Sequence, residues 1–180
     1  DLMALPGVGG VCSQEALNIP PLIQGGTGIH GDEYPNPQAY PDAYEAGTLN
    51  MPAIWSLKVA IENIEKRQEA NSQYESDLLK LLVKGLQKDP NITLYNIDKP
   101  RVSTICFNVN GVPSSDVVAY LDKHGVCVRG GIHCAILAHT QIGTVETGAV
   151  RVSLNAYNTP EEVEKFIQII GDIKNALGIL

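Results

Sequence analysis

The pattern of apolar and polar positions divides the chain near residue 50. The first 50 residues show no helical repeat: apolar runs at 1–5 and 8–12 are typical of strands, and 25–44 is a loop rich in Gly, Pro, Tyr and Asp. A loop of that length is often functional. Because the chain opens at Asp1 inside a strand-like segment, we expect further sequence upstream.

Helical periodicity begins at Pro52, a residue suited to a first helical turn. Apolar residues then recur every three or four positions, which predicts one helix through 52–64 and another through 74–86. We interpret the first as a linking helix, residues 51–68, and the second as the first helix of a domain that spans 69–180. Residues 1–50 would then be the tail of another domain.

Strand-like and helix-like segments alternate after residue 90. Strands are predicted at 92–97, 102–109, 126–128 and 149–157. A first helix is predicted to begin at Ser114 or Ser115, either of which can act as its N-cap, and to end at Gly125. A short helical turn is predicted at 135–139, and a longer helix from Pro160. Thr159 and Glu162 form a capping box for the last of these. The alternation predicts a compact α/β domain whose sheet is covered on one face.

Composition narrows the choice of partners. The net charge is -7 and no Lys/Arg cluster is present, which argues against binding to nucleic acid or to a membrane surface. No apolar run approaches the roughly 20 residues of a membrane span. The cysteines have the spacing of neither a disulfide framework nor a metal site, so we expect no metal and a cytoplasmic protein with reduced thiols. They are Cys12, Cys106, Cys127 and Cys134.

One stretch has the composition of a reactive thiol site: Arg129-Gly130-Gly131-Ile132-His133-Cys134. The two glycines allow a turn after the short strand, and a nearby cation such as Arg129 or His133 favours the thiolate that makes cysteine a nucleophile. A following helical turn would add to that effect. The alternative is a buried cysteine beside an ordinary turn, and the residues alone leave both open.

Three other stretches are weaker candidates. Arg151 lies in a strand on the face opposite its aliphatic neighbours, where a carboxylate would suit its planar guanidinium, although a solvent-facing arginine is equally compatible. Gly25-Gly26-Thr27-Gly28 can direct backbone N–H groups at an anion, although most such loops are simply turns. Residues 45–50, which end at Asn50, form a polar helix entry.

Taken in order, these stretches resemble the class V aminotransferase family, and within it the cysteine desulfurase and selenocysteine lyase branch. The resemblance covers essentially the whole chain. It rests on Gly25-Gly26-Thr27-Gly28, Tyr44-Glu45-Ala46-Gly47-Thr48-Leu49-Asn50, Arg129-Gly130-Gly131-Ile132-His133-Cys134-Ala135, Arg151-Val152-Ser153 and Tyr157-Asn158-Thr159.

The resemblance implies the C-terminal portion of a pyridoxal-phosphate-dependent transferase of fold type I. Such an enzyme would be a homodimer with a large cofactor domain and a small C-terminal α/β domain. Cys134 would attack the substrate sulfur, leaving alanine and an enzyme persulfide for a sulfur-acceptor protein. Arg151 would hold the substrate carboxylate, with Asn50, Arg129 and His133 as further substrate contacts. Thr27, with Gly26, would reach the cofactor phosphate.

Two departures from the family pattern stand out. The family places the lysine that holds the cofactor between the two N-terminal strands, yet here Gly7 runs directly into Val8 and no lysine precedes Lys58. We therefore expect a lysine-bearing segment to be missing between Gly7 and Val8, and the chain alone to be inactive. Gly130 and Ile136 replace a small hydroxyl residue and a proline, which we expect to loosen the cysteine turn.

Three functional interpretations remain open. The first is a cysteine desulfurase acting on L-cysteine or selenocysteine, and the second is a related lyase, epimerase or aminotransferase in which Cys134 has no sulfur role. The third is a folded, cofactor-free piece that binds a partner or dimerises.

Overall fold

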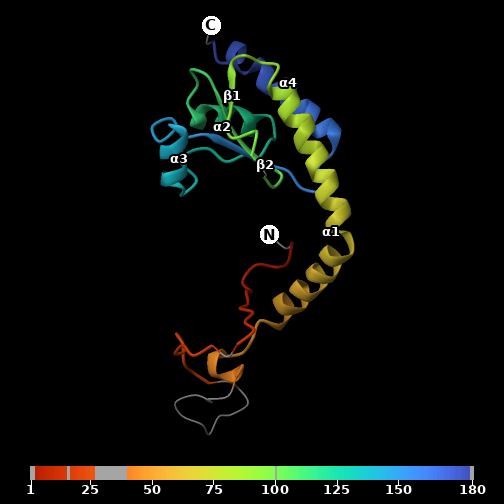
Figure 1. Ribbon diagram of the computed structural model, residues 1–180, viewed down its shortest axis with the longest axis vertical. Helices are drawn as coiled ribbons and strands as arrows, with labels where there is room; N and C mark the ends of the chain where they lie inside the picture. The colour runs from red at the N-terminus through yellow and green to blue at the C-terminus, as the bar shows by residue number, and fades with distance from the viewer. Residues whose placement is uncertain (1–2, 16, 27–39, 100, 179–180) are drawn as a thin grey trace. The chain divides into compact units, whose positions relative to one another are not determined.

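A computed structural model describes residues 3–15, 17–26, 40–99 and 101–178. The chain divides into two compact units, Asp1–Arg67 and Gln68–Leu180 (Figure 1). Each unit is considered by itself. None of the helices in these ranges is long and apolar enough to cross a membrane.

The first unit contains little regular structure before its helix. Its elements are the short 3-10 helix η1 (Asp42–Tyr44) and the first part of α1 (Met51–Leu86). The predicted strands at 1–5 and 8–12 are wrong: residues 3–15 form no strand. A strand is stabilised by hydrogen bonds to a neighbouring strand, and the described part of this unit contains no other strand that could pair with these segments. Val11 is accordingly 81% exposed.

The two helices predicted at 52–64 and 74–86 are one continuous helix, α1. Residues 65–73 between them are polar except for Ala70, which hides the apolar repeat, but they include no glycine or proline that would interrupt a helix. Asn50 begins α1, because its Oδ1 accepts a hydrogen bond from Ala53 N at 3.3 Å, as an N-cap residue does.

The second unit is built on a three-stranded antiparallel sheet in the order β1-β2-β3. The strands are β1 (Ile92–Leu94), β2 (Thr104–Val109) and β3 (Val150–Ser153). Each is shorter than predicted at one or both ends. The strand predicted at 126–128 is wrong, because these residues pair with no other strand. The next residue, Arg129, forms an isolated antiparallel bridge with Arg151.

Three helices complete the second unit: α2 (Ser114–Lys123), α3 (Ile136–Ile142) and α4 (Pro160–Ala176). The predicted capping box is confirmed, since Thr159 Oγ1 accepts from Glu162 N and Glu162 Oε2 accepts from Thr159 N. The predicted serine N-cap of α2 is wrong. Pro113 occupies the N-cap position, and Ser114 Oγ instead donates to Thr147 O at 2.9 Å.

One face of the sheet packs against α2, α4 and the C-terminal part of α1, as predicted for an α/β domain (Figure 1). Ile105, Phe107 and Val109 of β2 contribute to this core, and Phe107 packs edge-on against Phe166 of α4. Because successive side chains in a strand point to opposite faces, Thr104, Cys106 and Asn108 lie on the other face. The core therefore leaves the second face of the sheet for polar groups.

Candidate functional site

The base of the cysteine turn is bonded to β3. Arg129 N donates to Arg151 O at 3.2 Å and Arg151 N donates to Arg129 O at 2.7 Å. Two residues further along, Gly131 O accepts from Ala149 N at 3.1 Å. These bonds fix where the turn leaves the sheet, so the position of Cys134 relative to Arg151 depends on backbone geometry.

The glycines of the turn are closely packed. A Cβ at Gly130 would lie 2.8 Å from Val118 Cγ2 and 3.2 Å from Ser114 O. A Cβ at Gly148, whose φ is +63°, would lie 2.8 Å from Gly131 Cα. Such distances exclude a side chain unless the neighbours move. The expectation that Gly130 and Ile136 loosen the turn stays a prediction, and at Gly130 the absence of a side chain allows this close packing.

The turn itself has an unusual backbone. His133 and Cys134 have φ values of +53° and +58°, the left-handed region that few non-glycine residues adopt. This conformation costs about 1–2 kcal/mol per residue, so surrounding contacts must maintain it. Cys134 is exposed, and its Sγ lies 3.9 Å from Arg129 Nη2. The guanidinium of Arg129 is thus the cation that lies beside the exposed thiol.

Arg151 lies on the open face of the sheet, opposite the buried side chains of Val150 and Val152. Its Nε is buried and makes no hydrogen bond within the described residues. A buried guanidinium N–H without a partner is costly, and a carboxylate can accept two parallel hydrogen bonds from the guanidinium. The position therefore suits an arginine that binds an anionic group, such as a carboxylate, that is not part of this domain.

The sequence analysis missed a second arginine with the same property. Arg101 Nη2 is also buried without a hydrogen-bond partner among the described residues. The half-buried Cys106 lies within the field of both arginines: burial raises the pKa of its thiol, while the charges of Arg151 and Arg101 act to lower it. The sequence did contain a signal for Arg101. It is a cation just before β2, and the alternating pattern of β2 already placed polar residues on the open face.

The histidines of the turn form another contact that sequence reasoning missed. His139 had no assigned role, yet it is only 3% exposed. Its Nε2 lies 3.3 Å from His133 Nδ1, and its Nδ1 lies 2.7 Å from Thr144 Oγ1. Burial lowers the pKa of His133 and the charge of Arg151 acts in the same direction, whereas the hydrogen bond to the Arg129 backbone acts to raise it. His133 is therefore held towards its neutral form.

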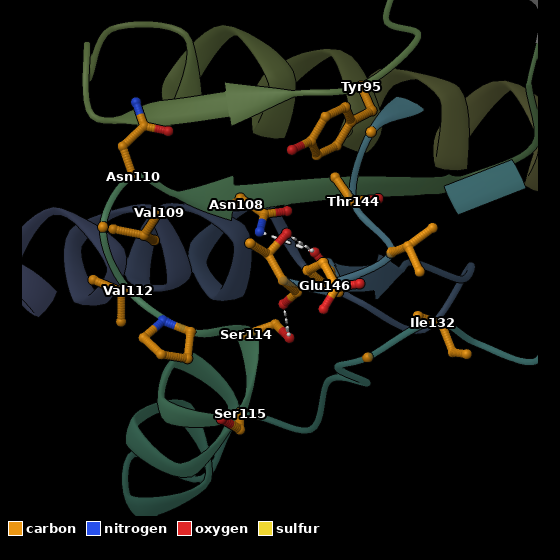
Figure 2. A pocket seen from close by; sticks show the side chains of 17 residues that line it. Tyr95, Asn108, Val109, Asn110, Val112, Ser114, Ser115, Ile132, Thr144 and Glu146 are labelled. Atoms are coloured by element: carbon orange, nitrogen blue, oxygen red, sulfur yellow. Dashed lines mark hydrogen bonds between the residues drawn. The ribbon is translucent and has the colours of Figure 1, made fainter. Parts of the chain in front are cut away.

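An open pocket of about 850 Å³ is lined in part by Gly131 and Ile132 of the turn (Figure 2). Ile132 and Thr144 line it, together with Asn108 from β2. Asn108 Nδ2 donates to Gly148 O at 3.0 Å, while its Oδ1 is buried without a partner in the described part of the chain. The pocket thus borders the same segments that hold Cys134.

Gly26 and Asn50, two further predicted site residues, belong to the first unit. Gly26 O accepts from Gly47 N at 2.7 Å, which joins the glycine-rich loop to the segment before α1. Thr27, predicted to reach the cofactor phosphate, lies outside the described residues. The roles of all three stay predictions.

Covalent attachment of pyridoxal phosphate requires a lysine. None occurs before Lys58. Lys58 itself pairs with Glu62 at 3.0 Å on the surface of α1 and lies over the ring of Trp55. The described residues therefore include an arginine that suits a carboxylate and an exposed thiol, and the cofactor-holding lysine stays a prediction for the complete protein.

An α/β domain that presents a cysteine turn beside a strand arginine agrees with the predicted class, the C-terminal portion of a transferase of fold type I that uses pyridoxal phosphate. The chain belongs to the aminotransferase class-V family, whose profile matches residues 2–166. Its relatives confirm the predicted cysteine desulfurase branch.

Among these relatives, a cysteine desulfurase of Escherichia coli O157:H7 is 32% identical over 180 residues, 96% of this chain and 43% of the relative. A probable cysteine desulfurase of Xylella fastidiosa is 31% identical, and the match covers 92% of this chain and 40% of that relative. The crystal structure of an Escherichia coli cysteine desulfurase matches with a TM-score of 0.72 at 28% identity, covering 89% of this chain and 39% of that one. The apo cysteine desulfurase of Thermococcus onnurineus NA1 matches 76% of this chain and 34% of its own, with a TM-score of 0.68 at 32% identity. The chain spans about two fifths of the length of the curated relatives.

Proposed function

We propose that the complete protein is a cysteine desulfurase that converts L-cysteine to L-alanine and leaves a persulfide on Cys134. The observation that carries this proposal is the exposed Cys134, whose Sγ lies 3.9 Å from Arg129 Nη2 on a turn bonded to Arg151. The names of the relatives support the reaction, since those reported above are cysteine desulfurases or a probable one.

Substrate binding would depend on Arg151. Its buried Nε–H lacks a partner among the described residues, and the α-carboxylate of cysteine would accept from it. Asn50, Arg129 and His133 would make the remaining substrate contacts. The neutral form of His133, favoured by its burial, would leave the substrate carboxylate paired mainly with the arginines.

The sulfur step would use the thiolate of Cys134. Its Sγ attacks the sulfur of the substrate, so that an S–S bond forms as the substrate C–S bond breaks. The electron pair of that bond stays with the substrate carbon, which takes up a proton to give alanine. Cysteine and the enzyme thiol together become alanine and the persulfide, so no external oxidant or reductant is required. Pyridoxal phosphate supplies the electron sink when it is bound to the complete protein.

The proposal includes further features of the complete protein. The complete protein would be a homodimer in which Thr27 and Gly26 contact the cofactor phosphate. A lysine-bearing segment would separate Gly7 from Val8, and this chain alone would be inactive. The persulfide sulfur would pass to an acceptor protein for iron–sulfur cluster or other biosynthesis. L-Selenocysteine is the alternative substrate for the same residues.

The test compares Cys134→Ala with Cys127→Ala in the complete protein, since Cys127 is also exposed and lies just before the turn. We expect the first variant to lose sulfide release and the persulfide, and the second to keep both. Undiminished sulfide release from Cys134→Ala would overturn the proposal and leave a related lyase or aminotransferase. A peptide map across Gly7 and Val8 tests the missing segment, and a direct bond between them would refute it.

A further inference from the structure

Thr144, His139 and His133 form a hydrogen-bonded series that ends on the backbone of the cysteine turn. Thr144 Oγ1 lies 2.7 Å from His139 Nδ1, and His139 Nε2 lies 3.3 Å from His133 Nδ1. The last contact joins His133 Nε2 to Arg129 O at 3.0 Å. The series therefore connects α3 and the residues after it to the first residue of the turn.

The final carbonyl determines which atom donates at every step. A carbonyl oxygen only accepts, so His133 Nε2 must carry the proton, and in a neutral ring His133 Nδ1 is then an acceptor. His139 must donate to it from Nε2, and in a neutral His139 ring Nδ1 is then an acceptor for the Thr144 hydroxyl. Burial lowers the pKa of His133 and favours the neutral ring that this arrangement needs. All three groups are thus satisfied by one set of proton positions.

The series acts on the strained part of the chain. His133 and Cys134 are consecutive non-glycine residues with φ values of +53° and +58°. The His133 ring is held from one side by Arg129 O and from the other by His139, which is buried. Backbone bonds hold His139 in turn, because its N–H donates to Ala135 O at 3.1 Å and its carbonyl accepts from Thr144 N at 2.9 Å.

Arg129 links the series to the thiol. The residue whose carbonyl accepts from His133 also places its Nη2 3.9 Å from Cys134 Sγ. Loss of the histidine contacts would release His133 from Arg129 and allow the left-handed turn to relax. The thiol would then lose its fixed position beside the guanidinium.

We propose that His139 is a positioning residue for Cys134: oriented by Thr144, it donates a hydrogen bond to His133 and so maintains the left-handed turn that places the thiol beside Arg129. This inference rests on the proposed function only in taking Cys134 as the nucleophile. It assigns His139 no contact with substrate or cofactor.

The first test is spectroscopic and needs no variant. In the ¹⁵N-histidine-labelled chain we expect a coupling across the hydrogen bond between His139 Nε2 and His133 Nδ1, and a slowly exchanging Nε2 proton on His139. His124, whose ring is exposed, provides the internal reference. Rapid exchange of the His139 Nε2 proton at the rate of His124, without the coupling, would overturn the inference.

The second test follows the rate at which iodoacetamide alkylates Cys134 at neutral pH, with Cys127 as the internal control. We expect His139→Leu to slow alkylation of Cys134 at least threefold relative to Cys127. His139→Gln retains an N–H donor and should restore most of the rate. Thr144→Val should act in the direction of His139→Leu, whereas Thr140→Val, which removes an exposed hydroxyl bonded to Ile136 O, should not.

An unchanged rate of Cys134 alkylation in His139→Leu and Thr144→Val would refute the positioning role. If His139→Leu fails to fold, Thr144→Val and the spectrum of the unaltered chain still decide the question. Alkylation requires neither substrate nor cofactor, so it separates the two proposals. Slowed alkylation in these variants, with no sulfide release from the complete protein, would contradict only the proposed function.

Discussion

Arg129 and Arg151 exchange both of their backbone hydrogen bonds, at 3.2 and 2.7 Å. The exchange brings two cationic side chains together at the edge of the sheet, one beside the Cys134 thiol and one on the open face. Backbone pairing tolerates changes of side chain. Each arginine can therefore be replaced without moving the other, which makes their separate roles testable.

Replacing Arg151 by Met should separate stability from substrate binding. Because its Nε is buried without a partner among the described residues, we expect the free energy of unfolding to stay within about 1 kcal/mol or to rise. Hydrogen bonds to charged groups contribute about 1.5–3 kcal/mol, so KM for cysteine in the complete protein should rise about 10- to 100-fold. Urea unfolding of the chain and steady-state kinetics measure the two effects.

Arg151→Lys is the matched control, since it keeps the charge but loses the planar fork. We expect it to show an intermediate KM. A stability loss above about 2 kcal/mol in Arg151→Met, with KM unchanged, would identify Arg151 as a structural arginine instead.

Cys106 should be the slowest of the four thiols to react with iodoacetamide. Burial raises the pKa of its thiol, and only the thiolate reacts. Its alkylation profile should therefore lie at higher pH than that of the exposed Cys127, as followed by mass spectrometry of the peptides. Arg151→Met removes a positive charge that opposes the effect of burial and should move the profile further upward. Equal rates at Cys106 and Cys127 would contradict the covered position of Cys106 in β2.

Local signals predicted the second unit well. The capping box at Thr159 depends on residues three apart, and the orientation of Arg151 follows from strand alternation, so both are present in short stretches of sequence. The strands predicted at 1–5 and 8–12 failed for the opposite reason. A strand needs a neighbour, and its pairing is not encoded within the segment itself.

The site was predictable only in part, for a similar reason. The residues flanking Cys134 indicated a turn with a nearby cation, and Arg129 is indeed close to its sulfur. No local pattern indicates that His133 and Cys134 both adopt left-handed backbone, or that His139 reaches back across the turn. These features arise from tertiary contacts between α3 and the turn.

Thr159→Ala should destabilise the chain by about 1 kcal/mol, the usual cost of losing an N-cap side chain. Thermal unfolding measures this, with Glu161→Gln as the control, because Glu161 lies in the same first turn but outside the capping box. A Thr159→Ala protein as stable as the control would show that the box has no net effect.

The other half of the box should make stability depend on pH. The side chain of Asn158 and the backbone N–H of Thr159 lower the pKa of Glu162. A carboxyl whose pKa is lower in the folded state stabilises above its unfolded pKa, and this is lost as the pH falls through the folded pKa. The stability difference between the unaltered chain and Glu162→Gln should therefore be present at pH 7 and shrink in acid. A difference that stays constant down to pH 3 would contradict it.

Gly85 and Gly171 both lie inside helices of the second unit, but their surroundings predict opposite results for substitution by Ala. In α4, a Cβ at Gly171 would meet nothing within 4 Å, so Gly171→Ala should stabilise by about 0.5–1 kcal/mol through helix propensity. In α1, a Cβ at Gly85 would lie 2.8 Å from Ile167 Cγ1. Overpacking of this kind costs about 1–3 kcal/mol, so Gly85→Ala should destabilise despite the same gain in propensity.

A double-mutant cycle identifies the cause. Ile167→Ala removes the side-chain atoms that Gly85→Ala would meet, so the double variant should be more stable than the sum of the two single changes by at least about 1 kcal/mol. Denaturant unfolding of the four proteins gives the coupling directly. Overpacking that the Ile167 side chain causes must disappear when that side chain is removed. If the free-energy changes of the two single variants instead add within about 0.5 kcal/mol, α1 and α4 do not approach so closely at this point in solution.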